Sequence, residues 1–168
     1  RGVENDIWYP LHHPEARQMK GFPHEEYTIG EIQDLVKAYG DAAVRAKLAG
    51  FDFIEVHGAH CHGLSLFLSP RTNQRKDIYG GSPENRRRIL LEIIEDIRGK
   101  IGKEYPLGVR LNGADSVSGG LTIEETIETA RFLEKQGVDL IHMSNDGAAG
   151  SMFIPLGQNI WAAEAVKK

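Results

Sequence analysis

The chain has 168 residues, 40% hydrophobic and 26% charged, a composition ordinary for one soluble globular domain. Its formal net charge is −4 with acidic and basic residues interspersed, which argues against a nucleic-acid or anionic-membrane partner. No apolar run approaches the roughly 18 residues of a membrane span, no signal-peptide pattern is present, and the single cysteine, Cys61, excludes an intrachain disulfide and suits a cytoplasmic protein.

The chain opens with a segment, 1–27, that is predicted to be a loop leading in from a preceding part of the protein. Four turn-forming residues interrupt any regular element there: Pro10, Pro14, Gly21 and Pro23. A helix is predicted to begin after Thr28, because Thr28 and Glu31 have the spacing of a capping box, and to end at Gly50.

The next stretch, FDFIEVHGAHCHGLSLFLSP, carries most of the chemistry. A buried strand is predicted for Phe51–His57, and its alternation places Glu55 and His57 on one face. The apolar residues 64–68 are expected to pack the following loop back against the fold. Between strand and loop lies a turn with three more titratable side chains: His60, Cys61 and His62.

Helices and strands continue to alternate through the rest of the chain. Ser82 and Thr122 are predicted N-caps, and Gly102 and Gly137 are predicted helix ends. The predicted elements are a helix over 83–101, a strand over 107–111, a helix from about 122 to 136, a strand over 138–144 and a helical pattern from about 158 to the end.

Strands separated by helices run parallel in one sheet, so the fold class is α/β, either doubly wound or part of a (βα)8 TIM barrel. At the carboxyl end of each predicted strand, alternate residues that face the same side of the sheet are polar, which is typical of a barrel rim. An open sheet would more often have a GxGxxG turn after its first strand, and this sequence has none. A barrel needs eight strands in about 250 residues, so we expect 28–168 to be an incomplete barrel from the middle of a longer protein. The polar pairs are Glu55 and His57, Arg110 and Asn112, and His142 and Ser144.

Four motifs together resemble the Old Yellow Enzyme family of flavin-dependent ene reductases and NADH:flavin oxidoreductases: FDFIEVHGAH, LSLFLSPRTNQRKDIYGGSPENRRR, PLGVRLN and GLTIEETIETARFLEKQGVDLIHMSND. The resemblance extends from Thr28 to about Ala165. It implies an FMN-binding barrel that takes hydride from NADH or NADPH and reduces a polarised C=C bond in an enone, enoate or dienoyl thioester. In the longer dienoyl-CoA-reductase-like members an iron–sulfur motif lies further C-terminal, so such a cluster would belong to a segment beyond this sequence.

The resemblance also implies site residues. His57 and His60 would hydrogen-bond the substrate oxygen, as fixed donors for the charge that develops there. Arg110 would lie at the N1/O2 edge of the flavin and stabilise its anionic reduced ring. Many members carry a proton-donating tyrosine two residues after the second histidine. Here His62 stands at that position, so His62, another residue or water supplies the proton.

Other interpretations of these residues stay open at this point. The histidines and Cys61 are donors of the kind that zinc prefers, so a zinc-dependent barrel hydrolase is the weaker alternative, although no second cluster accompanies them and we predict no metal site. Arg110 is also expected to pair with Glu55. The segment 146–151, DGAAGS, either cradles a phosphate or covers the site as a lid.

A rival from another class is a non-catalytic half-barrel. Three parallel strands on their own leave two unpaired edges and an uncovered face, which favours self-association into a homo-oligomer or an assembly module, and the isolated stretch is expected to be inactive. The charged run 73–88 is predicted to be structural. Four of its side chains are expected to brace the loop against the barrel: Arg75, Asp77, Asn85 and Arg86.

Overall fold

The computed structural model describes residues 26–115, 118–144, 157 and 159–168. Its elements alternate as predicted, with one short helix added after the first strand. They are α1 (Ile29–Leu48), β1 (Ile54–Gly58), α2 (Leu64–Leu68), α3 (Pro83–Ile101), β2 (Leu107–Asn112), α4 (Ile123–Lys135), β3 (Leu140–Ser144) and α5 (Ile160–Lys167). The expectations for 146–151 and, apart from residues 26 and 27, for the 1–27 loop lie outside the described residues.

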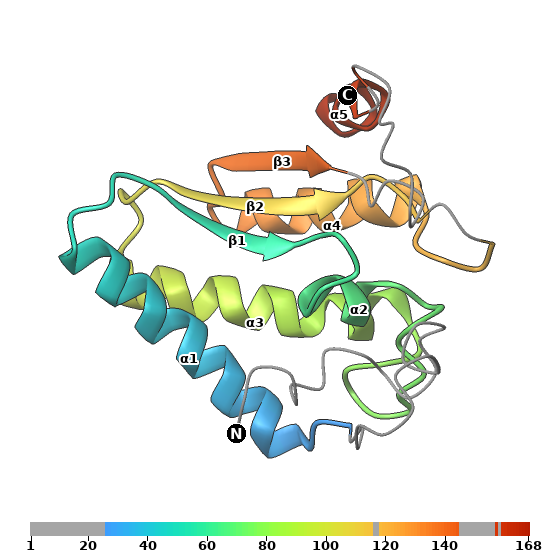
Figure 1. Ribbon diagram of the computed structural model, residues 1–168, viewed down its shortest axis with the longest axis horizontal. Coiled ribbons are helices and arrows are strands. Elements are labelled where there is room, and N and C mark those ends of the chain that lie inside the picture. Colours follow the sequence, from blue (N-terminus) through green and yellow to red (C-terminus); the bar gives the residue numbers. More distant parts are fainter. Residues whose placement is uncertain (1–25, 116–117, 145–156, 158) are drawn as a thin grey trace.

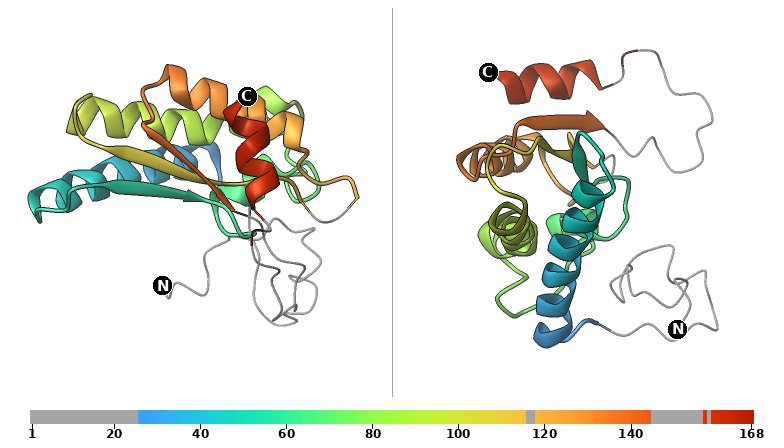
Figure 2. Two further views of the ribbon diagram at one scale, coloured as in Figure 1. Left: turned by 90° about the horizontal axis from the view of Figure 1, so that it is seen from above. Right: turned by 90° about the vertical axis from the view of Figure 1, so that its left-hand side faces the viewer.

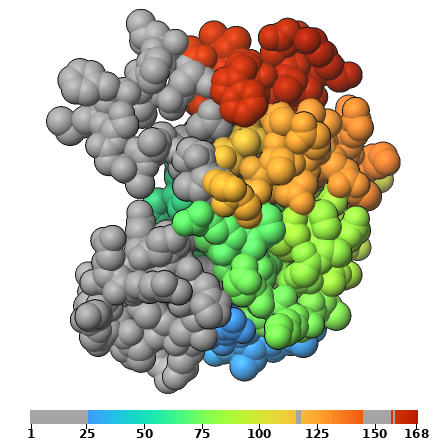
Figure 3. Space-filling view, turned by 90° about the vertical axis from the view of Figure 1, so that its right-hand side faces the viewer, coloured from blue at the N-terminus to red at the C-terminus, as the bar shows by residue number. Residues whose placement is uncertain are grey.

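The three strands form one parallel sheet in the order β1-β2-β3 (Figure 1). Since each strand is separated from the next by a helix, the connections are the predicted crossovers. The register aligns His57 with Arg110 and Arg110 with His142. All three carboxyl ends therefore meet at one edge of the sheet. Figure 3 views the molecule from this side and shows the segments that follow β1, in green, beside those that follow β2, in yellow to orange.

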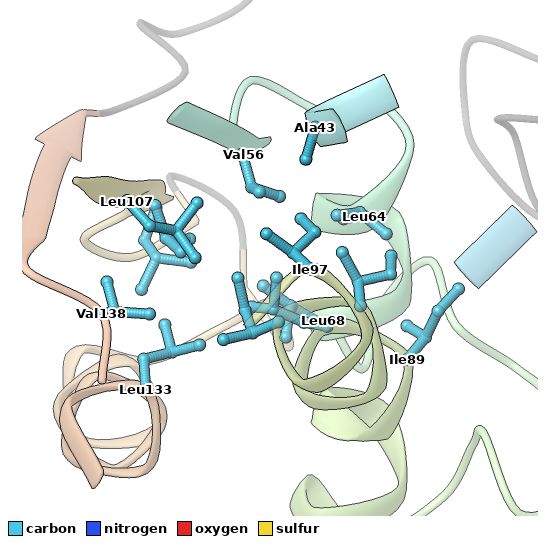
Figure 4. Close-up of a cluster of buried hydrophobic side chains, with 14 of the residues drawn as sticks. Ala43, Val56, Leu64, Leu68, Ile89, Ile97, Leu107, Leu133 and Val138 are labelled. Carbon is cyan, nitrogen blue, oxygen red and sulfur yellow. The ribbon is translucent and has the colours of Figure 1, made fainter. Parts of the chain in front are cut away.

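The hydrophobic core lies between the sheet and the helices α1, α3 and α4, which cover one face (Figures 1 and 2). In Figure 4, Val56 and Leu107 point from the sheet toward Ile97 on α3 and Leu133 on α4. α5 packs against α4 and β3. The predicted apolar face of α3 is fully buried and comprises Ile89, Leu90, Ile93, Ile94, Ile97 and Ile101.

The helix ends follow the predicted capping residues. Thr28 and Glu31 form the reciprocal capping box of α1, and the hydroxyls of Ser82 and Thr122 accept backbone N–H groups at the starts of α3 and α4. The glycines that follow the first, third and fourth helices have φ values of 82° to 86°, a left-handed conformation that favours glycine: Gly50, Gly102 and Gly137.

The predicted strand Phe51–His57 was wrong at both ends. β1 begins at Ile54, whose N–H donates to the carbonyl of Pro106 at 3.2 Å, and it ends at Gly58. Phe51 and Phe53 are 63% and 38% exposed rather than buried. The strand begins where its neighbour can pair with it, so the two phenylalanines stay in the connection from α1.

Three other boundaries also differ from the prediction. β2 extends to Asn112, β3 begins at Leu140, and α5 begins at Ile160. The segment expected to be a loop at 64–68 is the helix α2, and its leucines are buried. Within residues 26–115, 118–144 and 159–168, no helix is both long and apolar enough to cross a membrane.

The charged run after α2 is structural, as predicted. Arg86 is buried and donates to the carbonyls of Leu68 at 2.9 Å and Gly81 at 2.5 Å, and it forms an ion pair with Glu125 on α4. Arg75 pairs with Asp77 at 2.5 Å. The arginines therefore join the end of α2, the following loop and α4 into one support beneath the turn after β1.

Candidate active site

The face of the sheet opposite the helices carries the predicted polar residues. In the first row at the carboxyl ends, His57, Arg110 and His142 lie side by side on β1, β2 and β3. In the next row Asn112 pairs with Ser144. The parity argument is confirmed, and the residues that the sequence placed at separate strand ends lie together at one edge.

The turn after β1 brings its histidines together. His60 and Cys61 have φ values of 63° and 54°, in the left-handed region that side chains other than glycine rarely adopt, at a cost of order 1–2 kcal/mol each. The turn places the His60 ring edge-on to His57, with ring centroids 5.2 Å apart, and the His62 ring 6.3 Å from His57. Backbone strain at this position is typical of a site that must hold side chains in a set geometry.

Two residues of the neighbouring strands hold His60 in place. The side-chain oxygen of Asn112 accepts the backbone N–H of His60 at 3.0 Å, and the hydroxyl of Ser144 lies 2.6 Å from His60 Nε2. Asn112 is 2% exposed and Ser144 9%. Sequence reasoning placed both on the correct face but assigned them no role. The only signal in the sequence for a role was the position of these two residues at the strand ends.

His57 is kept neutral by its surroundings. The loss of part of its water shell lowers its pKa most, and the nearby groups of His60, Arg110 and His62 lower the pKa further, while Glu55 opposes them. A neutral imidazole offers one N–H donor and one acceptor. At neutral pH, His57 is therefore suited to donating a hydrogen bond without carrying a charge of its own.

Arg110 is anchored by the predicted ion pair. Its Nη2 lies 2.9 Å from Glu55 Oε1, and the second oxygen of Glu55 lies 2.8 Å from His142 Nδ1. His142 Nδ1 is also 3.2 Å from Arg110 Nε. Because a carboxylate only accepts, we assign the Nδ1 proton to the shorter contact with Glu55. The contact between Glu55 and His142 was not predicted, although the two residues share a face.

Cys61, the single cysteine of the chain, lies between His60 and His62 and is partly buried. Among the residues that the structure describes, no three or more His, Cys, Asp or Glu side chains gather closely enough to hold a metal ion. The described residues of this edge include the imidazoles of His57 and His60 and the guanidinium of Arg110 as potential hydrogen-bond donors.

The chain is similar to known proteins of one enzyme family. A family model described as the NADH:flavin oxidoreductase / NADH oxidase family matches residues 9–155. The chain is 44% identical over 155 residues to an NADH oxidase of Thermoanaerobacter brockii, covering 88% of this chain and 24% of the relative. It is 40% identical over 167 residues to an NADPH dehydrogenase of Bacillus pumilus, covering 99% of this chain and 48% of the relative.

The fold has a close counterpart among solved structures. A 2-naphthoyl-CoA reductase in complex with 2-naphthoyl-CoA matches with a TM-score of 0.76 and 36% identity, over 87% of this chain and 23% of that one. The chain thus spans at most about half the length of these relatives.

Proposed function

The chain belongs to the NADH:flavin oxidoreductase / NADH oxidase family, as its motifs predicted, and we propose that the protein is an FMN-dependent enzyme that uses NADH or NADPH to reduce a polarised C=C bond. Its three parallel strands and their helices are part of a (βα)8 barrel, which confirms the predicted fold class. One observation carries the proposal: His57, His60 and Arg110 come together at the carboxyl edge of the sheet, where barrel enzymes hold their active sites.

The donors on this edge fit a flavin. Arg110 keeps its positive charge at any physiological pH, and Glu55 holds its guanidinium on the polar face. When bound, a flavin supplies the two-electron chemistry of the reaction. Arg110 would hold the edge of the flavin ring on which negative charge accumulates, and Glu55 would keep the guanidinium in position.

His57 and His60 would hold the substrate by its carbonyl or nitro oxygen. Their rings lie 5.2 Å apart, so an N–H donor of each ring can point at one oxygen, and the lowered pKa of His57 favours its uncharged form as one of these donors. Negative charge grows on that oxygen as the conjugated bond is reduced, and fixed donors stabilise it. The complex of a similar protein with 2-naphthoyl-CoA supports a conjugated carbonyl, such as an acyl thioester, as the substrate class.

His62 would return a proton to the substrate. It is exposed, and its ring lies 6.3 Å from His57. The imidazole side chain of histidine can both donate and accept a proton. We therefore expect His62→Tyr to keep most alkene reduction, because a phenol also donates a proton, and His62→Phe to lose more of it.

The test separates the two halves of the reaction in the full-length protein. In the double variant His57→Ala with His60→Ala, we expect flavin reduction by NAD(P)H to continue at the wild-type rate, while alkene reduction falls by about 10²–10³-fold. Lys37→Ala on the exposed side of α1 serves as a control and leaves both steps unchanged. An unchanged alkene step in the double variant would contradict the assigned roles.

A further inference from the structure

We propose that Ser144 is a positioning residue that fixes His60 in the tautomer with its proton on Nδ1. The functional weight of this inference rests on the proposed role of His60 as a substrate donor, but the tautomer itself is a separate property of the chain. Ser144 is the last residue of β3, 84 positions after His60. The contact therefore joins the ends of the first and third strands.

The contact is short and its serine is well anchored. Ser144 Oγ lies 2.6 Å from His60 Nε2, within the range of a strong hydrogen bond. The backbone carbonyl of Ser144 accepts the N–H of Gly113 at 3.0 Å, which ties the end of β3 to that of β2. Because Ser144 is buried, water does not readily replace this bond.

The direction of the hydrogen bond decides the tautomer. A serine hydroxyl either donates or accepts, whereas each nitrogen of a neutral imidazole does only one of the two. Within the described residues, Ser144 Oγ has His60 Nε2 as its hydrogen-bond partner. If Nε2 donated, the buried O–H would be left without an acceptor among those residues, which is unfavourable. The hydroxyl therefore donates, Nε2 accepts, and the ring proton lies on Nδ1.

The backbone of His60 is held as firmly as its ring. Its N–H donates to the buried side chain of Asn112 at 3.0 Å, at a residue whose φ of 63° few other side chains would accept. The Asn112 carbonyl in turn accepts the hydroxyl of Thr126 on α4 at 3.1 Å. With the backbone tied to β2 and the ring tied to β3, His60 cannot exchange its two nitrogens by a ring flip without losing the bond to Ser144.

The tautomer matters because a substrate oxygen needs an N–H. A histidine with a lone pair on the nitrogen that meets the substrate would repel an oxygen that gains negative charge. Ser144 thus selects which nitrogen of His60 donates. His57 has a different environment, in which the loss of part of its water shell and the neighbouring charges lower its pKa.

The test reads the tautomer directly in the full-length protein. With ¹⁵N-labelled histidine, two-bond proton–nitrogen correlations distinguish Nδ1–H from Nε2–H, and His60→Gln assigns the His60 signals. We expect Nδ1–H in the wild type, a shift toward Nε2–H in Ser144→Ala, and Nδ1–H again in Ser144→Thr, which keeps the hydroxyl. Thr126→Val removes a buried hydroxyl one step further away and should leave the tautomer unchanged.

Kinetics then separate this inference from the proposed function. We expect Ser144→Ala to slow alkene reduction about tenfold, the effect of one misdirected hydrogen bond, without slowing flavin reduction. An Nε2–H signal in the wild type, or a tautomer unaffected by Ser144→Ala, overturns the inference. The wild-type signal decides even if Ser144→Ala fails to fold. A tautomer that shifts as expected with unchanged alkene reduction supports the role of Ser144 and contradicts the proposed role of His60.

Discussion

The two faces of the same three strands differ completely. On the face covered by the helices, Val56, Leu107 and Val109 are at most 3% exposed and pack into the hydrophobic core. On the opposite face, Glu55, Arg110 and His142 form a chain of polar contacts with side chains 22% to 44% exposed. Alternation along a strand thus separates the residues that stabilise the fold from those that carry chemistry, at neighbouring positions.

The comparison has an energetic consequence. Burial of apolar side chains contributes most of the folding free energy, whereas ion pairs that water still reaches contribute about 0–1 kcal/mol. Substitutions on the helix-covered face should therefore lower stability, and those on the polar face should mainly alter binding and catalysis.

The largest effect on stability is expected in the core. Ile97 on α3 is 1% exposed and points toward Val56 of β1 (Figure 4). Ile97→Ala should lower the free energy of unfolding by about 2–5 kcal/mol, because it leaves a cavity. The exposed Ile78, at 49%, provides the matched control, and Ile78→Ala should cost less than about 1 kcal/mol in urea denaturation. Equal costs for the two would remove the distinction between core and surface.

A buried charge on the helix side should come next. Arg86 joins Leu68, Gly81 and Glu125, so Arg86→Ala leaves three acceptors without their donor. We expect a loss of about 2–4 kcal/mol in the free energy of unfolding. Arg131→Ala, at an exposed position of the same helix pair, should lie within about 0.5 kcal/mol of wild type. A cost for Arg86→Ala as small as that of Arg131→Ala would show that the support beneath the turn is dispensable.

The polar face should respond differently to the loss of an arginine. Arg110→Met removes the contact with Glu55 but should change the free energy of unfolding by at most about 1 kcal/mol, because water screens this pair. Flavin affinity, measured by fluorescence titration, should fall clearly. A destabilisation as large as that of Arg86→Ala, with unchanged flavin affinity, would show that Arg110 stabilises the fold and does not bind the flavin.

The smallest effect is a pH dependence of stability that arises from His57. Its pKa is lower in the folded protein than the value of about 6.5 expected in the unfolded chain. As pH falls below about 6.5, the unfolded chain binds this proton first, so the His57 contribution to stability decreases until the folded pKa is passed and is constant above about 6.5. His57→Gln should remove this slope in urea denaturation across pH. An NMR titration that places the folded pKa at or above 6.5 would contradict it.

The sequence predicted the helices well because their signals are local. Thr28, Ser82 and Thr122 each bind a backbone N–H three residues away, a contact that spacing alone reveals. The start of β1 depends instead on pairing with Pro106, more than fifty residues along the chain. From its sequence, Phe51 therefore looked like part of the strand. The neighbouring strand does not extend far enough to pair with it, so it stays exposed.

The positions of the site residues on the sheet could be predicted from the sequence, but the contacts between their side chains could not. Parity and parallel order placed His57, Arg110 and His142 on one face at one edge. The approach of His60 to Ser144 depends on two successive left-handed residues and on a register set across three strands. No sequence pattern predicts a histidine with a left-handed backbone conformation. The contact of the His60 ring with Ser144 could therefore be known only from the fold.

The most direct test of the account is the visible absorbance spectrum of the full-length protein, titrated with FMN. We predict a perturbed flavin spectrum that saturates at one FMN per chain and a weaker titration in Arg110→Met. Such a result would establish the polar face as the cofactor-binding face of the sheet. A spectrum identical to that of free FMN at every ratio would contradict the account, because no flavin would then be bound beside the histidines.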